Sequence, residues 1–414
     1  MSVSDSATPT PAPAGPKARV LSGMRPTGAL HLGHYHGALK NWVKLQDQYD
    51  CFYFVADWHA LTTHYEDRAV IERSVYDMVI DWVASGLDPD KSTIFIQSRL
   101  PEHAELFTLL AMGTPLGWLE RVPTYKDQLE NLKDKDLTTY GFLGYPLLQA
   151  ADILIYKATY VPVGEDQASH VELTREVARR FNHLYGRGAG FEAKVAAALA
   201  KLGKDDTRYL EKQRKAYGES GAAEALAKGE GIIRKAAVVL SDEETELLLG
   251  HLKGSGRTVL PEPLALHTEV LRMPGLDGRK MSKSYGNAVL MREEPAEVTR
   301  KLRGMTTDPA RARRTDPGNP SNCPVWGLHK IYSSEETRDW VTKGCTSASI
   351  GCLDCKQPVI DAVLAEQKPW RERADEYLAN PKKIHWIVEM GTERARTVAR
   401  QTMKDVRQAI GLSY

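Results

Sequence analysis

Apolar and polar residues follow one another in the first hundred positions in a pattern that predicts alternating strands and helices. A strand beginning at Val20 ends in a glycine-containing turn, and apolar residues then recur at helical spacing from Leu32. An unbroken apolar run over residues 51–56 indicates a strand covered on both faces. An amphipathic helix over 67–85 and a further strand over 92–96 come next. This order predicts an α/β domain with a doubly wound parallel sheet, which binds ligands at the carboxyl ends of its strands.

The pattern changes in the second third of the chain. Two helices are predicted over residues 140–156 and 166–184, separated by a short segment around Pro162. Residues 187–260 are rich in Ala, Lys, Glu and Gly and poor in aromatic residues, and two or three helices fit there. A strand over 267–273 then resumes the α/β alternation.

These changes divide the chain into domains. We expect a disordered tail over residues 1–17, which are mostly Ser, Thr, Pro and Ala. The α/β domain is expected in two parts, 18–186 and 261–292, with residues 187–260 as an insertion. Residues 293–414 are mainly helical and form a second domain.

Composition sets outer limits on the function. The chain has 414 residues, of which 42% are hydrophobic and 26% charged, as in globular proteins of more than one domain. A net charge of +1 argues neither for nor against nucleic acid as a partner. The sequence contains no apolar run long enough to span a bilayer and no secretory signal at its start. We therefore expect a cytoplasmic protein without a membrane partner.

Two pairs of basic residues indicate a phosphate site. His31 and His34 lie three apart at the start of a predicted helix, where backbone N–H groups favour anions, and Gly33 lets a nucleotide approach closely. Lys280 and Lys283 lie on a Gly-rich, mobile stretch that could close over a pyrophosphate. Taken alone, the histidines suit a solvated or core position and the lysines suit an ordinary basic loop. Together, they favour binding of a nucleoside triphosphate, and no P-loop motif occurs elsewhere in the sequence.

One apolar helix carries an inward carboxylate. Tyr145, Gln149 and Asp152 are spaced i, i+4 and i+7, so that their polar ends lie on one face. A buried carboxylate needs a partner, because an unpaired charge away from water is costly. The N–H group of a bound ligand and an internal salt bridge are equally suitable partners on spacing alone.

Four cysteines crowd together late in the chain, whereas Cys51 stands alone in a strand. Cys323, Cys345, Cys352 and Cys355 read C-x₂₁-C-x₆-C-x₂-C. In a reducing compartment such a group suggests a metal site rather than disulfides. Four thiolates can hold either a tetrahedral Zn²⁺ or a cubane iron–sulfur cluster, and the spacing leaves both open.

The two basic segments carry a family resemblance. His31-Leu32-Gly33-His34 and Lys280-Met281-Ser282-Lys283-Ser284 resemble the HIGH and KMSKS signatures of class I aminoacyl-tRNA synthetases. That resemblance implies a Rossmann-like catalytic domain, activation of an amino acid by ATP with Mg²⁺, and transfer of the amino acid to tRNA. It also implies that His31, His34, Lys280 and Lys283 stabilise charge on the phosphates as catalytic residues.

Four other strings resemble the tryptophanyl-tRNA synthetases: residues 22–28, 57–60, 161–167 and 170–175. Tyrosyl-tRNA synthetases are the nearest rival, but the string from Pro162 to Gln167 favours tryptophan. The resemblance implies that Asp152 accepts the indole N–H group and that Tyr145, Gln149, Gln167 and His59 complete the tryptophan site. It implies an ATP site made of Arg25, Pro26, Thr27, Gly33, His34, Gly164, Glu165, Asp166, Lys280, Met281, Ser282, Lys283 and Ser284.

The cysteine spacing is similar to that of some bacterial tryptophanyl-tRNA synthetases, which carry a [4Fe–4S] cluster in the anticodon-binding domain. This favours iron–sulfur over zinc and makes residues 293–414 the anticodon-binding domain. The expected partners are ATP, L-tryptophan, tRNA(Trp) and a second copy of the chain. A synthetase-derived regulatory protein and an adenylating enzyme with another acceptor are the alternatives.

Overall fold

The computed structural model describes the chain apart from short gaps. The described residues are 17–123, 125, 138–164, 168–188, 190–220, 222–254, 256–267 and 272–414. The predicted tail therefore lies almost wholly outside them.

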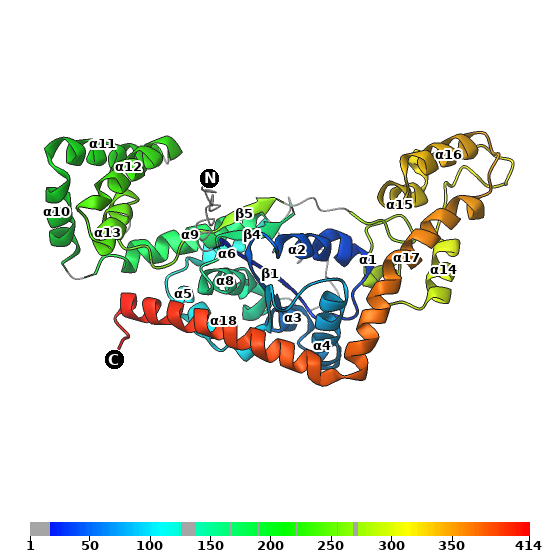
Figure 1. The fold of residues 1–414 in the computed structure, drawn as a ribbon, viewed down its shortest axis with the longest axis horizontal. Helices are drawn as coiled ribbons and strands as arrows, with labels where there is room; N and C mark the ends of the chain where they lie inside the picture. The colour runs from blue at the N-terminus through cyan, green and yellow to red at the C-terminus, as the bar shows by residue number, and fades with distance from the viewer. Residues whose placement is uncertain are drawn as a thin grey trace, which may run out of the picture.

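A five-stranded parallel sheet forms the centre of the molecule (Figure 1). Its strands run in the order β3-β2-β1-β4-β5, so the chain winds outward in both directions from β1. That order reverses beside β1, which opens a crevice at the carboxyl ends of β1 and β4. The predicted doubly wound α/β fold is confirmed. The strands are β1 (Arg19–Met24), β2 (Asp50–Val55), β3 (Ser92–Ile96), β4 (Tyr160–Val163) and β5 (Leu264–His267).

Both faces of the sheet are apolar, because successive side chains point to opposite sides. Val20 and Tyr53 belong to one hydrophobic cluster and Leu21 and Phe52 to another, and all four are almost completely buried. Helices cover each face. The first cluster includes residues from α1 (Leu32–His34), the π-helical turn Tyr35–Leu39, α2 (Lys40–Leu45), α4 (Arg68–Ala84) and α17 (Cys352–Ala379). The second includes residues from α5 (Glu102–Ala111), α6 (Leu116–Glu120), α8 (Tyr140–Ile155), α9 (Ala168–Tyr185) and α18 (Pro381–Ile410).

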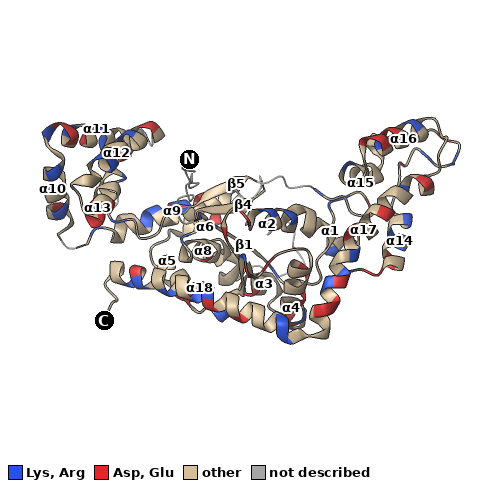
Figure 2. Cartoon of the chain, viewed as in Figure 1, with Lys and Arg blue, Asp and Glu red and all other residues tan. Residues whose placement is uncertain are grey.

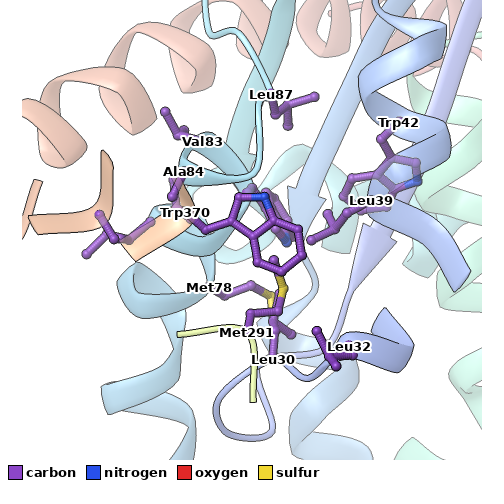
Figure 3. Packing of buried hydrophobic residues seen from close by; sticks show 14 of the residues in the cluster. Leu30, Leu32, Leu39, Trp42, Met78, Val83, Ala84, Leu87, Met291 and Trp370 are labelled. Atoms are coloured by element: carbon purple, nitrogen blue, oxygen red, sulfur yellow. The ribbon is translucent and has the colours of Figure 1, made fainter. Parts of the chain in front are cut away.

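The first cluster joins distant parts of the chain. In Figure 3, Trp370 of α17 lies beside Met78 of α4 and Met291, with Leu30 just before α1 close by. The C-terminal helices therefore share one continuous core with the central sheet. Leu30 and Met291, which flank the two predicted signature segments, meet inside this core.

Residues 187–260 contain a helical module with a core of its own. Its buried residues, from Phe191 to Leu252, form a separate hydrophobic cluster. The described residues hold four α-helices there, more than the two or three expected: α10 (Phe191–Leu202), α11 (Lys204–Ser220), α12 (Ala223–Lys235) and α13 (Asp242–Leu252). The module projects from the end of α9, and both signs of charge are mixed over its helices (Figure 2).

The two ends of this module meet at a narrow neck. The Arg257 N–H group donates to the Gly186 carbonyl oxygen at 2.9 Å. A Cβ atom on Gly256 would lie 1.9 Å from that oxygen, so only glycine allows the two segments to approach so closely.

The C-terminal third contains α14 (Pro295–Gly304), α15 (Pro324–Tyr332), α16 (Glu335–Thr346), α17 and α18. The first four lie to one side of the sheet, whereas α18 runs back beneath the sheet and its covering helices (Figure 1). It approaches the sheet closely at Gly391, where an added Cβ atom would come 1.8 Å from the Ile94 carbonyl oxygen of β3. Among the described residues, no helix combines the length and the apolar character that crossing a bilayer needs.

Two strands differ from the sequence prediction. The segment around Pro162, expected as a link between helices, is β4, which pairs with β1 and β5. Proline within a run of residues normally argues against a strand, which explains the error. Strand β5 ends at His267, where a strand was expected to begin, and residues 268–271 lie outside the described part of the chain.

Candidate active site

The two signature segments lie side by side although they are far apart in sequence. The Leu32 N–H group donates to the Val289 carbonyl oxygen at 3.0 Å, and the Met291 N–H group donates to the Leu30 carbonyl oxygen at 2.9 Å. Met281 of the KMSKS segment is buried in the same hydrophobic cluster as Leu30 and Leu32. The structure therefore brings together the two pairs of basic residues singled out from the sequence.

The two histidines form a close pair at the start of α1. Their ring centroids are 3.8 Å apart, and the His31 backbone N–H group donates to His34 Nδ1 at 3.1 Å. Because Nδ1 accepts this bond, the ring hydrogen of a neutral His34 is on Nε2, where it can be donated to a ligand. A Cβ atom on Gly33 would lie 2.9 Å from the His31 ring, which explains the glycine between them.

The electrostatics of the pair result from burial and from the lysines. Burial lowers the pKa of His31 to about 4, and the charges of Lys283 and Lys280 act in the same direction. The pKa of His34 is also lowered, mainly by burial and then by His31. Both rings are therefore neutral near pH 7, and the positive charge of the site resides on the lysines.

Lys283 already reaches across to the turn after β1. Its Nζ atom donates to the Thr27 carbonyl oxygen at 2.8 Å. Gly28, with φ +105°, leaves room for it, because a Cβ atom there would lie 3.1 Å from Nζ. Burial lowers the pKa of this lysine, and the carboxylate of Asp81 opposes that shift. Lys280, by contrast, is exposed to solvent.

Asn287, which the sequence analysis did not single out, holds the KMSKS loop together. Its Oδ1 atom accepts from the Ser282 N–H group at 2.8 Å. Its Nδ2 atom donates to Asp277 Oδ1 at 2.7 Å and to the Lys280 carbonyl oxygen at 3.2 Å. One buried side chain thus fixes both ends of the loop. A polar residue just after Gly286 was the available signal in the sequence.

A cavity of about 390 Å³ opens at the carboxyl ends of β1 and β4. Five of the predicted site residues line it: Arg25, His59, Tyr145, Gln149 and Asp152. Thr62 and His170 line it as well and were not predicted as site residues. The apolar part of the wall includes Phe54, Ile153 and the three residues 161–163. The cavity therefore has one apolar side and one polar side, as expected of a site for an amphipathic small molecule.

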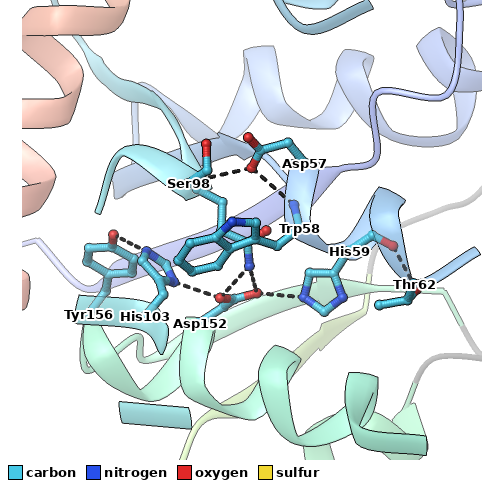
Figure 4. Close-up of polar contacts among 9 residues, drawn as sticks. Asp57, Trp58, His59, Thr62, Ser98, His103, Asp152 and Tyr156 are labelled. Carbon is cyan, nitrogen blue, oxygen red and sulfur yellow. Dashed lines mark hydrogen bonds and ion pairs between the residues drawn. The ribbon is translucent and has the colours of Figure 1, made fainter. Parts of the chain in front are cut away.

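Asp152 is the most buried polar group of this wall, with 1% of its side chain exposed. Its carboxylate accepts hydrogen bonds from His103 Nδ1 at 2.6 Å and His59 Nε2 at 2.8 Å (Figure 4). Gln97 Nε2 donates to both of its oxygens, at 2.8 and 3.0 Å. His103 Nε2 lies 2.7 Å from the Tyr156 hydroxyl, which fixes the orientation of that ring.

These donors keep Asp152 charged. Burial alone would raise the pKa of the carboxyl group, but the hydrogen bonds from His103 and His59 lower it below its ordinary value. The sequence left open an internal salt bridge or a ligand as the partner. The observed internal partners are two histidines and an amide, not an arginine or lysine. Gln97 and His103 come after β3, at its carboxyl end, and this placement was the missed signal.

Some of the remaining predicted residues lie outside the described part of the chain, and the others differ in how exposed they are to solvent. Glu165, Asp166 and Gln167 lie outside the described residues, and Gly164 is the last described residue before them. Pro26 is buried, Thr27 and Ser282 are half-buried, and Ser284 is exposed.

The four late cysteines come from three helices. Cys323 precedes α15, Cys345 lies near the end of α16, and Cys352 and Cys355 lie in the first turn of α17. Burial raises the pKa of the Cys355 thiol to about 12, and the other three thiols act on it in the same direction, which places the four in one neighbourhood. His329 Nε2 lies 3.3 Å from Cys355 Sγ, and Arg311 Nη1 lies 3.9 Å from Cys345 Sγ. In the described part of the chain, no three His, Cys, Asp or Glu side chains are close enough to hold a single metal ion.

Comparison with known proteins agrees with this geometry. The family model described as tRNA synthetases class I (W and Y) matches residues 14–209 and 242–365. A tryptophan–tRNA ligase of Ralstonia nicotianae is 62% identical, with 96% of this chain and 99% of the relative covered. One from Thermotoga maritima is 45% identical, with 96% and 100% covered. The tryptophanyl-tRNA synthetase of Campylobacter jejuni, solved with ADP and tryptophan, has a TM-score of 0.70 at 27% identity, covering 95% of this chain and 100% of that one. The chain therefore belongs to the class I tRNA synthetases of the tryptophan and tyrosine family.

Proposed function

We infer that the chain is a tryptophan–tRNA ligase. It activates L-tryptophan with ATP, forming tryptophanyl-adenylate and releasing pyrophosphate. It then transfers the amino acid to tRNA(Trp) with release of AMP. Two relatives of that name match almost the whole chain, at 62% and 45% identity. The observation that carries the substrate assignment is the charged carboxylate of Asp152 in the wall of a cavity whose other side is apolar.

The indole of tryptophan suits this cavity. Its apolar rings fit against Phe54 and Ile153, and its N–H group is the donor that Asp152 would accept. Gln97 reaches both carboxylate oxygens through one amide nitrogen, so a shift of this amide would free a lone pair for the ligand. A site built around a hydrogen bond strongly rejects amino acids that lack the matching donor. We assign Tyr145, Gln149, Gln167 and His59 to the same tryptophan site.

Adenylate formation depends on the neighbouring basic residues. The tryptophan carboxylate attacks the α-phosphorus of ATP in line, and pyrophosphate leaves from the opposite side. His34 Nε2–H, the neutral His31 ring, Lys280 and Lys283 would stabilise phosphate charge without transferring protons. Thr27 and Gly33, with the other residues of the predicted ATP site, would bind the nucleotide.

Mg²⁺ would enter with the triphosphate. Asp152 is the only acidic side chain among the described residues that line the cavity, and its carboxylate is already engaged by three donors. The ion would bind phosphate oxygens and would neutralise charge on the leaving pyrophosphate.

One assay tests the function. ATP–pyrophosphate exchange is measured with each of the twenty amino acids, and exchange is expected with tryptophan alone. Asp152→Asn should weaken tryptophan binding more than ATP binding, because the amide presents a donor toward the indole N–H group. Exchange that depends on tyrosine would contradict the assignment, and so would the absence of exchange with every one of the twenty amino acids. Exchange without charging of tRNA(Trp) would favour a regulatory paralogue.

We also propose a [4Fe–4S] cluster at the four cysteines, with Zn²⁺ as the alternative. Four thiols in one neighbourhood, with the Arg311 guanidinium beside Cys345, fit a negatively charged cluster. The cysteine spacing, which resembles that of cluster-bearing synthetases, favours iron–sulfur over zinc. The protein, purified without oxygen, should be brown and contain about four irons per chain. A colourless protein with one zinc per chain would refute this proposal.

A homodimer in the cytoplasm is the proposed assembly, since tRNA is charged there. Exposed apolar side chains at the ends of α5, α6 and α9 offer a surface for a second copy: Met112, Leu116 and Leu184. Light scattering should give twice the mass of the chain, and Met112→Asp should shift the protein toward monomer. A monomeric wild type would overturn this assembly.

A further inference from the structure

His36, two residues after His34, takes part in a buried polar cluster that joins the catalytic domain to the C-terminal helices. Its side chain is 1% exposed. Its Nε2 atom lies 2.9 Å from the Tyr332 hydroxyl of α15 and 3.1 Å from Glu366 Oε2 of α17. The Tyr332 hydroxyl donates to the same Glu366 oxygen at 2.8 Å. We call these three residues, which come from three elements and meet at one carboxylate oxygen, the clasp.

The clasp fixes which ring nitrogen of His36 carries the hydrogen. Nδ1 is buried and has no hydrogen-bond partner in the described part of the chain. A hydrogen on Nδ1 would leave a buried donor unpaired, whereas a hydrogen on Nε2 is shared between Glu366 and Tyr332. His36 is therefore a donor toward α17, and loss of the acceptor would leave that donor unpaired.

The backbone around His36 is unusual. Residues Tyr35–Leu39 form a π-helical turn between α1 and α2, rather than a continuous α-helix. Such turns are rare and occur often at functional sites, because an extra residue in the turn rotates the helix before it relative to the helix after it. Here the helix before the turn is α1, which carries His34.

The next residues of α17 contact the other signature segment. Gln367, which is fully buried, donates through Nε2 to the Leu290 carbonyl oxygen at 2.7 Å. Leu290 in turn forms an antiparallel bridge with His31. One turn of α17 therefore contacts the chain after HIGH through Glu366 and the chain after KMSKS through Gln367.

Aromatic packing reinforces the same joint. The Trp370 ring lies 4.3 Å from the Tyr35 ring, centroid to centroid, and is 3% exposed. Figure 3 shows it between α4 and the segment that carries Met291. The joint is thus largely shielded from water on the side of His36, whereas the Glu366 side chain keeps 22% of its surface exposed. Hydrogen bonds in such a partly buried place are stronger than they would be in solvent.

We propose that His36 is a positioning residue for adenylate formation, and that the clasp holds α1 at the distance from the KMSKS segment that ATP requires. The proposal rests on the proposed function. The chemical step needs both basic pairs on one triphosphate, so we expect the clasp to affect that step. Tryptophan binding should be affected less, because none of the clasp residues lines the tryptophan cavity.

The test compares Tyr332→Phe, Glu366→Gln and the double variant in tryptophan-dependent ATP–pyrophosphate exchange. Each single change should lower kcat roughly ten- to a hundredfold, the effect of losing one hydrogen bond to a charged group. KM for tryptophan should stay unchanged. The double variant should lose little more than the worse single variant, because both changes disable the same group.

Tyr53→Phe is the matched control, since it removes a buried tyrosine hydroxyl that donates to the Trp42 carbonyl oxygen at 3.3 Å within the catalytic domain. It should lose a similar amount of thermal stability and keep its kcat. Clasp variants that melt earlier but keep the wild-type kcat would overturn the proposal, and so would an equal fall of kcat in Tyr53→Phe. If Tyr332→Phe does not fold, Glu366→Gln, which keeps the shape of the side chain, decides alone. A wild-type protein without exchange would refute the proposed function instead.

Discussion

At the scale of single residues, the site separates charge from hydrogen bonding. In the proposed mechanism the lysines would supply positive charge to the phosphates, whereas His31 and His34 are kept neutral by burial and by that charge. A neutral imidazole with hydrogen on Nε2 is a directional donor, and it does not repel the ammonium groups beside it. This division of roles makes different predictions for the two residue types.

Replacing Lys283 by Ala should slow adenylate formation roughly a hundredfold, because a charge aimed at the transferring phosphate is lost. Tryptophan binding, measured by equilibrium dialysis, should stay nearly intact, since Lys283 does not line the tryptophan cavity. Lys343→Ala on the exposed face of α16 is the control and should change neither quantity. Equal losses of rate and of tryptophan affinity would count against the assigned role.

The low pKa of His31 should appear in the stability of the protein. The folded pKa of about 4 lies below the ordinary value of 6.5, so the unfolded chain binds a proton first as pH falls. Stability from this residue is therefore complete above pH 6.5 and is lost as pH falls toward 4, by up to roughly 3 kcal/mol. Urea unfolding of wild type and His31→Gln between about pH 7 and 4 should show a shallower pH dependence in the variant. Parallel curves would contradict the shifted pKa.

Individual site residues were predictable where one helix or one motif carries them. Tyr145, Gln149 and Asp152 share a face of α8 by spacing alone, and the structure places all three on the cavity wall. The donors to Asp152 were not predictable in the same way, because His59 and His103 come from different elements. Their meeting depends on how β2 and β3 lie in the sheet, which spacing along the chain does not encode.

At the scale of elements, the longest helices connect regions that the sequence presents as separate. α17 runs from Cys352 to the joint with the HIGH helix, and α18 then returns along the sheet to cover it. The sequence predicted that residues 293–414 are mainly helical, but not what the apolar side chains of these two helices cover. β4, by contrast, was not predicted as a strand at all. It has only four residues, one of them a proline, and so short a run shows no recognisable strand pattern.

The contact between α18 and β3 can be tested at one glycine. Gly391→Ala would place a Cβ atom 1.8 Å from the Ile94 carbonyl oxygen, so the helix must move away from the sheet. We expect the free energy of unfolding to fall by roughly 2–3 kcal/mol, as for other overpacked cores. Thermal and denaturant unfolding measure the change.

Gly231→Ala in α12 is the matched control. A Cβ atom there meets nothing within 4 Å, and the position is exposed inside a helix. Helix propensity then predicts no loss and a gain of up to about 1 kcal/mol. Equal melting temperatures for the Gly391 variant and wild type would show that α18 is not held tightly against β3.

At the scale of the whole molecule, the site lies at the carboxyl ends of the strands, whereas the inserted module joins the sheet near the opposite, amino ends. The cavity lies at the carboxyl ends of β1 and β4. α9 carries the chain from β4 back toward the start of β5, and the module leaves and re-enters there, at the neck between Gly186 and Arg257. Since parallel strands all begin on the same side of the sheet, the module is joined to the side away from the proposed nucleotide site.

Removal of the module tests this separation. Replacing residues 188–255 by a short glycine-serine turn should preserve the fold, because the two ends already meet by a hydrogen bond of 2.9 Å and the module keeps its apolar core to itself. We expect wild-type kcat and KM for tryptophan in ATP–pyrophosphate exchange. Charging of tRNA(Trp), measured in parallel, would reveal any contact that the module makes with tRNA. A folded deletion variant with impaired exchange would show instead that the module supports the catalytic centre through the sheet, despite its distance from the phosphates.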